Sequence, residues 1–496
     1  ERTIQMAIPN PWGFAFDRWG QDFLLHTSGT TVNWALPVEV KPSFGSKTPS
    51  APDLVPEGHK IRPTSGLEIV SSRHFPDNIQ GDLIYCNAIG FLGIKSIGLE
   101  DDGTGWKTTH HDDLLQSSDG NFRPVDLEFA PDGSLYVIDW HNVLIGHMQH
   151  NARDPLRDHV HGRIYRITYP SRPLVQPAEI AGAPIATLLE NLKQPEYRTR
   201  YRTRRELRQR DAAEVLPAVK AWAAQQSDTH AKLEALWVTW GLNQVDAALL
   251  QEMLRSEDFH ARAAAVRVLR YNMDRVPNAT ALLEEAAVDA HGRVRLEAIV
   301  AASWMNDNAL ARKIVATAAA KPLDVWSEQA AKTASDRLAG IVEIEKPDHP
   351  TLPVPKHLKG PARKQYQLGQ EVYFRDGHCG TCHQPNGKGL DPAFPSLEKS
   401  PWLAGDPERA IKLALYGLMG PMEVNGKKYD GQVPMTPFGG LLKDEELAAV
   451  LTFVRNSFGN QESPVTTEQV QTVRKATAGR VMFYQTEELL KENPLK

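Results

Sequence analysis

The sequence has very few cysteines for its length, only Cys86, Cys379 and Cys382 among 496 residues. Three cysteines cannot build the disulfide framework of a small secreted scaffold. No run of about 18 apolar residues is present to form a transmembrane segment. The net charge of −5 gives no general attraction to nucleic acid or anionic lipid. An initiator methionine and a signal peptide are also lacking, which predicts a mature chain or a fragment.

The length predicts about three domains, because a single core seldom serves much more than about 150 residues. Residues 1–172 are rich in Gly, Asp, Asn and aromatic residues, with short apolar runs between turn signals. Two stretches, 12–25 and 125–140, share one pattern: an apolar strand, an Asp-x-Gly type of turn and a second apolar strand. In the second, Pro131-Asp132-Gly133 predicts a tight turn with positive φ at the glycine.

Recurring hairpins of this kind, with further strands expected at 81–87, 93–99 and 162–169, predict the blades of an all-β propeller. At about 40 to 50 residues each, 172 residues supply only two to four blades. A closed propeller usually needs more. We therefore expect a β-propeller portion that a missing N-terminal segment or another chain completes.

Residues 173–344 predict an α-solenoid of HEAT-like repeats. Apolar residues follow helical spacing, and similar segments recur at 230–236, 260–266 and 293–299. Two functions remain open for this region, a scaffold with a docking surface or a rigid spacer. A proline-rich linker is expected at 345–361, with five prolines in seventeen residues. An all-α domain should span 362–461. A tail at 462–496 follows, with a capping box from Thr466 to Gln469.

Within 362–461, Cys379-Gly380-Thr381-Cys382-His383 is the C-x-x-C-H motif for covalent haem attachment. It predicts that this domain is an all-α, class I-type cytochrome c domain. Thiols at this spacing can reach both vinyl groups of one porphyrin, and His383 then lies under the iron. A zinc site would need a second ligand pair, and a redox C-x-x-C would not need the adjacent histidine. Haem is attached outside the cytoplasm, so the motif predicts a periplasmic, cell-envelope or secreted bacterial protein.

The sixth iron ligand should be a methionine from a later loop. Met419, Met422 and Met435 are available, and Met435 lies 52 residues after His383 between two prolines that stiffen its loop. It also precedes the last helix of the domain, so we predict His383/Met435 ligation and assign Met419 and Met422 to packing or to the haem edge. Such ligation raises the iron potential and suits an acceptor of electrons from a dehydrogenase. Gly369 should allow the first and last helices of the domain to cross closely.

A histidine-rich stretch stands out in the first region, with five of the chain's 17 histidines within 141–161. Mixed with Arg and Asp, this stretch is compatible with a metal site, a general base or an anion clamp. It is equally compatible with a structural polar network in a long loop, and the spacing matches no specific metal motif. A second polar segment, 121–126, contains Arg123 and could face the same space.

Several of these segments together resemble a known family over nearly the whole chain, the haem-binding, membrane-bound dehydrogenase proteins of planctomycetes and verrucomicrobia. The segments that carry the resemblance are 121–126, 131–140, 145–166, 379–383, 417–426 and 447–460. Such proteins join a propeller similar to glucose/sorbosone dehydrogenases, a HEAT-like region and a C-terminal cytochrome c. The resemblance implies oxidation of a sugar or alcohol, with electrons leaving through haem c. It also allows pyrroloquinoline quinone and calcium as further cofactors.

Two functions follow as hypotheses. In the first, the protein is a cytochrome-linked dehydrogenase, in which His147 or His150 is the base that takes the hydroxyl proton. Arg123, Arg153 and Asp154 are then the candidate clamps for substrate or cofactor. In the second, the chain is a non-enzymatic electron-transfer and scaffold subunit of a larger redox complex. Both require a redox partner protein. A quinone or calcium in the purified protein would favour the first.

Overall fold

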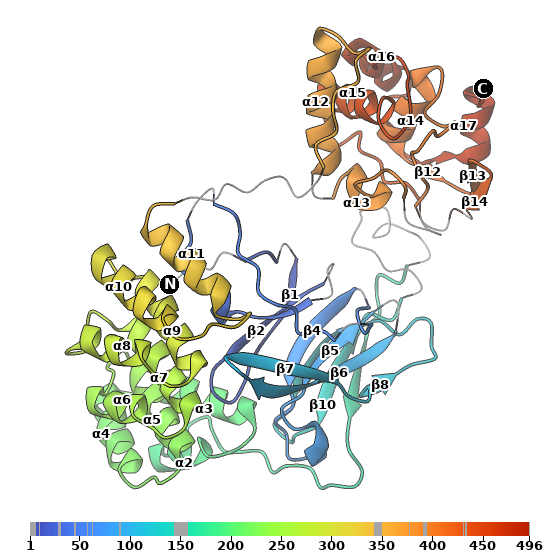
Figure 1. Cartoon of the computed structure of the whole chain (residues 1–496). Coiled ribbons are helices and arrows are strands. Elements are labelled where there is room, and N and C mark those ends of the chain that lie inside the picture. Colours follow the sequence, from blue (N-terminus) through green and yellow to red (C-terminus); the bar gives the residue numbers. More distant parts are fainter. Residues whose placement is uncertain are drawn as a thin grey trace. The chain divides into compact units, whose positions relative to one another are not determined.

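The computed structural model describes residues 6–8, 10–27, 31–43, 46–56, 58–61, 63–88, 91–142, 157–341, 350–375, 377–389, 394–429, 431 and 434–495. They fall into two compact units, one ending at residue 341 and the other beginning at residue 350 (Figure 1). Each unit has a hydrophobic core of its own. Among the described residues, no helix is both long and apolar enough to cross a membrane.

The first unit begins with three antiparallel sheets. In chain order their strands are β1 (Pro11–Phe16), β2 (Asp22–His26) and β3 (Thr31–Trp34); β4 (Thr64–Ile69), β5 (Leu83–Asn87), β6 (Gly93–Asp102), β7 (Gly105–His110) and β8 (Leu115–Gln116); β9 (Pro124–Phe129), β10 (Leu135–Asp139) and β11 (Arg163–Ile167). The first strand of each sheet is the one that meets its neighbour, since β1 packs on β4 and β4 on β9.

Both predicted hairpins are confirmed. β1 pairs with β2 across a turn in which Gly20 has φ of +78°, and β9 pairs with β10 across a turn in which Gly133 has φ of +81°. Only glycine adopts such φ values without a steric cost, so these two residues set the turns. The predicted strands at 81–87, 93–99 and 162–169 correspond to β5, β6 and β11.

The second and third sheets pack face to face. Ile84 and Cys86 of β5 meet Leu127 and Val137 of the third sheet in one apolar cluster. Cys86 is fully buried, so it is a small core residue rather than a reactive thiol. On the outer face of the third sheet, away from this cluster, Ile138 and Ile164 are exposed to solvent. The three sheets form no closed ring in the part of the chain that the structure describes, so the propeller stays a prediction.

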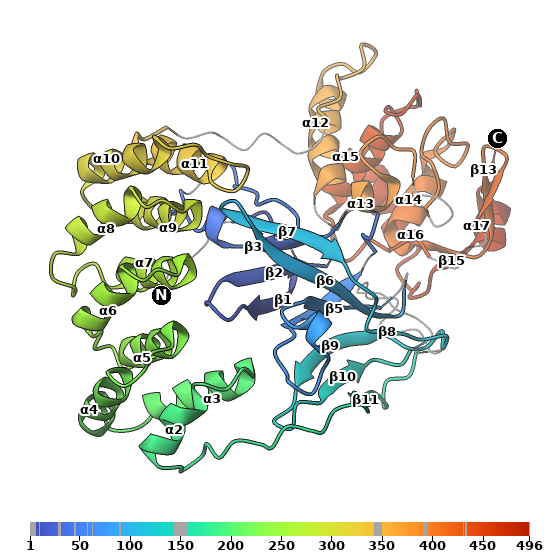
Figure 2. The same ribbon diagram turned by 60° about the horizontal axis from the view of Figure 1, so that its bottom comes forward.

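Helices follow the sheets in the same unit and are stacked in succession (Figure 2). They are α2 (Ile185–Asn191), α3 (Tyr197–Arg208), α4 (Ala212–Ala223), α5 (Thr229–Gly241), α6 (Ala247–Leu254), α7 (Phe259–Tyr271), α8 (Ala279–Ala287), α9 (Gly292–Ser303), α10 (Asn308–Ala319) and α11 (Glu328–Leu338). The three recurring segments lie in α5, α7 and α9, and α7 packs against both of the others. Their assignment to HEAT-like repeats stays a prediction.

Sheets and helices are joined by polar and aromatic contacts. Trp19, in the turn between β1 and β2, lies 5.3 Å from the ring of His230 and 5.0 Å from that of His260. Arg293 of α9 donates hydrogen bonds to the carbonyls of Thr104 and Gly105 at 2.9 and 2.6 Å. The helices therefore hold the turns of the first two sheets.

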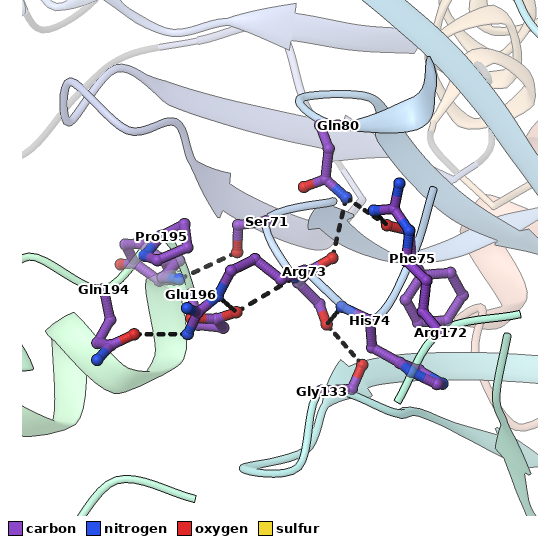
Figure 3. Close-up of polar contacts among 12 residues, drawn as sticks. Ser71, Arg73, His74, Phe75, Gln80, Gly133, Arg172, Gln194, Pro195 and Glu196 are labelled. Atoms are coloured by element: carbon purple, nitrogen blue, oxygen red, sulfur yellow. Dashed lines mark hydrogen bonds and ion pairs between the residues drawn. The ribbon is translucent and has the colours of Figure 1, made fainter. Parts of the chain in front are cut away.

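A second connection is made by the loop from Ser71 to Gln80 (Figure 3). Arg73 of this loop forms an ion pair with Glu196 at 2.8 Å, just before α3. The Ser71 hydroxyl accepts a hydrogen bond from the backbone N–H of Tyr197 at 3.0 Å. Arg172 donates to the carbonyl of Phe75 at 2.8 Å, so the loop also holds the segment that leaves β11.

His260 predicts a pH dependence of the first unit's stability. Burial lowers the pKa of His260, but hydrogen bonds at 2.8 Å to Asp101 and Asp258 outweigh it and leave the pKa raised. A raised folded pKa contributes stability that is fully present below the unfolded pKa of about 6.5 and is lost as pH rises through the folded pKa. We expect His260→Asn to cost about 1 kcal/mol at pH 5.5 and less at pH 8.5.

Urea unfolding of both proteins at the two pH values measures this difference directly. His161→Asn is the matched control, because His161 is 79% exposed beside Asp158. An equal loss at both pH values would show that the charge on His260 contributes nothing.

The second unit contains the helices α12 (Pro361–Phe374), α13 (Cys379–His383), α14 (Pro407–Tyr416), α15 (Asp444–Val454), α16 (Thr467–Ala476) and α17 (Thr486–Glu492), and the short strands β12 (Leu418–Met419), β13 (Met422–Val424), β14 (Lys427–Tyr429) and β15 (Tyr484–Gln485). α12 crosses α15 at Gly369, where a Cβ atom would lie 2.0 Å from the carbonyl oxygen of Ala449. The predicted close crossing is confirmed.

Segments on both sides of this helix pair pack onto it. Before α12, the backbone N–H of Leu352 donates to Gln370 at 2.8 Å, and Leu358 is buried. After α15, Thr466 and Gln469 form the predicted capping box at the start of α16. The described part of the predicted linker and the tail therefore belong to the same compact unit as the helices. The exact boundaries at 345, 361 and 461 stay predictions.

Candidate haem-binding site

The two motif cysteines lie on the short helix α13. Cys379 and Cys382 are three residues apart, so one helical turn brings them to the same side. α13 packs tightly on the end of α12, since a Cβ atom at Gly380 would lie 3.0 Å from the carbonyl oxygen of Tyr373. Burial raises the pKa of Cys379 to about 12 and also raises that of Cys382, so both thiols are uncharged at neutral pH.

His383 is the last residue of α13, and a hydrogen bond from its ring fixes its orientation. Its Nδ1–H donates a hydrogen bond of 2.9 Å to the carbonyl oxygen of Pro395. Because that bond uses Nδ1, the lone pair of Nε2 is left for a metal. Burial lowers the pKa of His383, which favours the neutral ring that a metal requires.

The loop that carries Met435 lies beside this motif. Three residues after the methionine, the ring of Phe438 is 5.7 Å from that of His378, the residue before Cys379. The backbone N–H of Phe438 also donates to the carbonyl of Ala414 at 2.8 Å. Met435 itself is partly buried and packs against an apolar cluster. The structure thus brings together the two segments from which axial ligands are predicted.

The other two methionines belong to the short strands. Met419 lies in β12 and Met422 in β13, and Met422 packs beside Trp402 and Tyr429 in a small apolar cluster. Met435 packs against the same cluster, so packing alone does not distinguish it. The assignments of Cys379, Cys382, His383 and Met435 to a haem stay predictions that this geometry suits.

Sequence reasoning missed the groups that hold the motif in place. The carbonyl of Pro395 comes from a loop twelve residues after His383. Phe458 packs against Gly387, where a Cβ atom would lie 2.3 Å from its ring. For Pro395, the only available signal was a proline in a short turn-rich stretch after the motif. Phe458 lies in the segment 447–460 that carries the family resemblance, but nothing in the sequence indicated its contact with Gly387.

Of the five residues predicted to act in substrate oxidation, the structure describes only one. His147, His150, Arg153 and Asp154 lie outside the described residues. Arg123 is described, and it donates to the carbonyls of Ala88 and Asn142 at 2.9 and 3.0 Å. These bonds tie loop ends of the second and third sheets together, which gives Arg123 a structural role. Its role as a clamp stays a prediction.

The first unit also contains a cavity that the sequence did not predict. It has a volume of about 360 Å³, lies where β1, β4 and β9 meet, and is lined by Trp12, Phe14, Glu68 and Glu128 among others. Burial and the neighbouring Glu128 raise the pKa of Glu68 to about 9, so Glu68 is protonated at neutral pH. Within the described ranges, no group of three or more His, Cys, Asp or Glu residues could hold a metal ion.

The second unit thus has the attachment motif, a histidine oriented by a carbonyl and a methionine loop, which define a c-type cytochrome domain and imply haem c. Comparison with known proteins agrees. Residues 366–458 match the family described as "Cytochrome c", and residues 3–171 match one described as "Domain of unknown function (DUF7133)". Cytochrome c-552 of Thermus thermophilus is 40% identical over 115 residues, which cover 21% of this chain and 83% of the relative. Through this domain, the chain belongs to the cytochrome c family.

Two further relatives are parts of dehydrogenases. The gluconate 2-dehydrogenase cytochrome c subunit of Pantoea cypripedii is 34% identical over 112 residues, or 22% of this chain and 24% of that subunit. The alcohol dehydrogenase (quinone) cytochrome c subunit of Gluconobacter oxydans is 29% identical over 117 residues, or 23% of each chain. The chain is therefore homologous to cytochrome subunits of dehydrogenases over its C-terminal domain.

Proposed function

We propose that the protein is a cytochrome-containing oxidoreductase of the bacterial periplasm or cell envelope. It takes electrons from the oxidation of a sugar or alcohol and passes them singly through haem c to a redox partner. The observation that carries this proposal is the 2.9 Å hydrogen bond from His383 to Pro395, because it leaves Nε2 available for iron beside two suitably spaced thiols.

The residues of the second unit fit the cofactor. Cys379 and Cys382 would hold the porphyrin by thioether bonds, and His383 and Met435 would be the axial ligands. When bound, haem c supplies a one-electron couple. The protein's own contribution is to orient a neutral His383 ring, to present Met435 from an apolar loop and to exclude water with the surrounding aromatic residues. A thioether opposite histidine raises the potential and so favours accepting electrons.

For the first unit we propose a dehydrogenase-like propeller portion (1–172) joined to a HEAT-like solenoid (173–344). The meeting of β1, β4 and β9 around one cavity supports the propeller, and the similar stacking of α5, α7 and α9 supports the repeats. His147 or His150 is the proposed base, with Arg123, Arg153 and Asp154 as clamps. Pyrroloquinoline quinone and calcium belong to this proposal only as predicted cofactors, because within the described residues no group of three or more His, Cys, Asp or Glu residues could hold the calcium ion.

The alternative is a non-enzymatic electron-transfer and scaffold subunit, and one surface favours it. On the outer face of the third sheet, Tyr136, Ile138 and Ile164 are 40%, 46% and 68% exposed. Ile138 and Ile164 are paired across β10 and β11, so they form one apolar strip. Such a strip suits a further β-sheet from another chain, with which this subunit would assemble in a larger redox complex.

Oxidised, haem-loaded protein mixed anaerobically with a panel of sugars and alcohols distinguishes the two functions. We expect growth of the ferrous haem spectrum with at least one substrate and without any added protein. Loss of the base in His147→Ala or His150→Ala should slow this reduction about 100-fold. His159→Ala, in the same histidine-rich stretch, should reduce haem at the normal rate. Reduction only when a partner dehydrogenase is added would identify the electron-transfer subunit instead.

A further inference from the structure

The backbone position of Met435 is set by the short strand β12. Its N–H donates a hydrogen bond of 2.9 Å to the carbonyl of Leu418, and the two residues form an isolated antiparallel bridge. β12 is only two residues long and cannot hold its place alone. Whatever fixes β12 therefore also fixes the candidate axial ligand.

The partner on the other edge of β12 comes from the C-terminal tail. β15 pairs with it in parallel, with Tyr484 opposite Leu418 and Gln485 opposite Met419. The Thr486 hydroxyl adds a bond of 3.3 Å to the carbonyl of Met419. β12 is thus held between the Met435 loop and a segment that lies beyond residue 458, where the cytochrome c match ends.

Close packing also holds the tail against the Met435 loop. Gly417, with φ of +74°, has no room for a side chain, since a Cβ atom would lie 2.1 Å from the carbonyl oxygen of Met435 and 2.8 Å from the Phe483 ring. Tyr484 is only 2% exposed and packs with Leu418, Leu489 and the partly buried Met435 in one apolar cluster. The tail and the loop therefore share one small core.

The tail also holds the far end of the loop. Arg474 of α16 donates to the carbonyl of Gly439 at 2.6 Å and forms an ion pair with Asp444 at 2.8 Å. Tyr416, just before β12, donates to the carbonyl of Thr477 at 2.9 Å. Both ends of the 418–439 segment are therefore attached to residues 474–486, which lowers the entropy lost when Met435 binds a metal.

We propose that the C-terminal tail, residues 466–493, is a brace that positions Met435 for the haem iron, with Tyr484 as its main positioning residue. This inference rests on the proposed axial ligation by Met435. It assigns the tail a function in setting the redox potential, because a loop that releases its thioether more readily gives a lower potential.

The full-length, haem-loaded chain provides the test. A thioether ligand gives ferric haem a weak far-red absorption band, which disappears as pH rises and another group displaces the sulfur. We expect Tyr484→Ala to lower the midpoint pH of this loss by about one unit, a tenfold easier displacement, because it leaves a cavity under β12. The reduction potential should fall with it, while covalent haem content stays the same.

Controls separate positioning from general damage. Tyr484→Phe keeps the ring and should restore the normal midpoint, and Val481→Ala, at a residue 90% exposed in the same tail, should leave it unchanged. If Tyr484→Ala binds no haem, Thr486→Val decides: it removes only the bond to Met419 and should lower the midpoint by a smaller amount.

Met435→Ala distinguishes the failure of this proposal from that of the ligand assignment. If Met435→Ala keeps the far-red band, Met435 is not the ligand and the proposed ligation is wrong. If Met435→Ala loses the band while the tail variants keep the normal midpoint and potential, the ligation stands and the brace is overturned.

Discussion

Replacing both Cys379 and Cys382 by alanine is expected to abolish covalent haem attachment. The two thiols lie three residues apart on α13, so each would form one thioether bond to the same porphyrin. Each single variant should keep one bond and a reduced yield, whereas the double variant should keep none. Haem staining after denaturing electrophoresis measures this directly, since only a covalent bond survives unfolding. Loss should be complete in the double variant.

Cys86→Ala is the matched control for this prediction. Cys86 is fully buried in the first unit, on β5, and belongs to no haem motif. It should stain as strongly as the parent protein, although the cavity it leaves costs about 1 kcal/mol of stability. Haem that remained covalently bound after loss of both motif cysteines would overturn the assignment of the attachment site.

The features that could be predicted from the sequence depend mostly on patterns within a few neighbouring residues. The hairpin turns at Gly20 and Gly133 depend on φ values that only glycine adopts freely, and the capping box at Thr466 depends on residues three apart. The haem motif is equally local, because α13 contains the whole of it. In each case the physical cause lies within a few residues, so the printed sequence contains it.

Contacts between distant residues were not predictable. The Trp19 ring lies against His230 and His260, more than 200 residues later, and Arg293 reaches the carbonyl of Thr104. Composition suggested separate β and α regions, yet these contacts join them in one compact unit. The same limit applied to the haem site, where the carbonyl that orients His383 and the tail beneath Met435 are known only from the fold.

The contacts between buried charged residues far apart in the chain were also not predictable from the sequence. Burial and the nearby Glu39 raise the pKa of Asp22 to about 7, although Arg267 and Arg270 oppose the shift. Arg270 forms an ion pair of 2.7 Å with Glu39, and Arg267 one of 2.7 Å with Glu297. Removing one partner of such a pair is costly, so the two pairs hold α7 to the segment after β3 and to α9.

Replacing Gly369 by valine is expected to prevent stable folding of the second unit. A Cβ atom at this position would lie 2.0 Å from the carbonyl oxygen of Ala449 and 2.8 Å from the Cβ of Phe453. The obstacle at Ala449 is backbone inside α15, so it cannot rotate away, and the helices must separate. Helix propensity alone would favour valine over glycine by less than about 1 kcal/mol. Overpacking should outweigh it by about 3 kcal/mol or more.

Urea unfolding followed by haem absorbance, together with haem content after expression, measures this loss. Gly369→Ala should fall between the parent and the valine variant, because it adds the obstructing Cβ but no further methyl groups. Gly479→Val is the matched control, since no atom lies within 4 Å of a Cβ there and the residue is exposed. It should unfold at nearly the parent urea concentration. A Gly369→Val protein of normal stability would mean that α12 and α15 do not cross at this glycine.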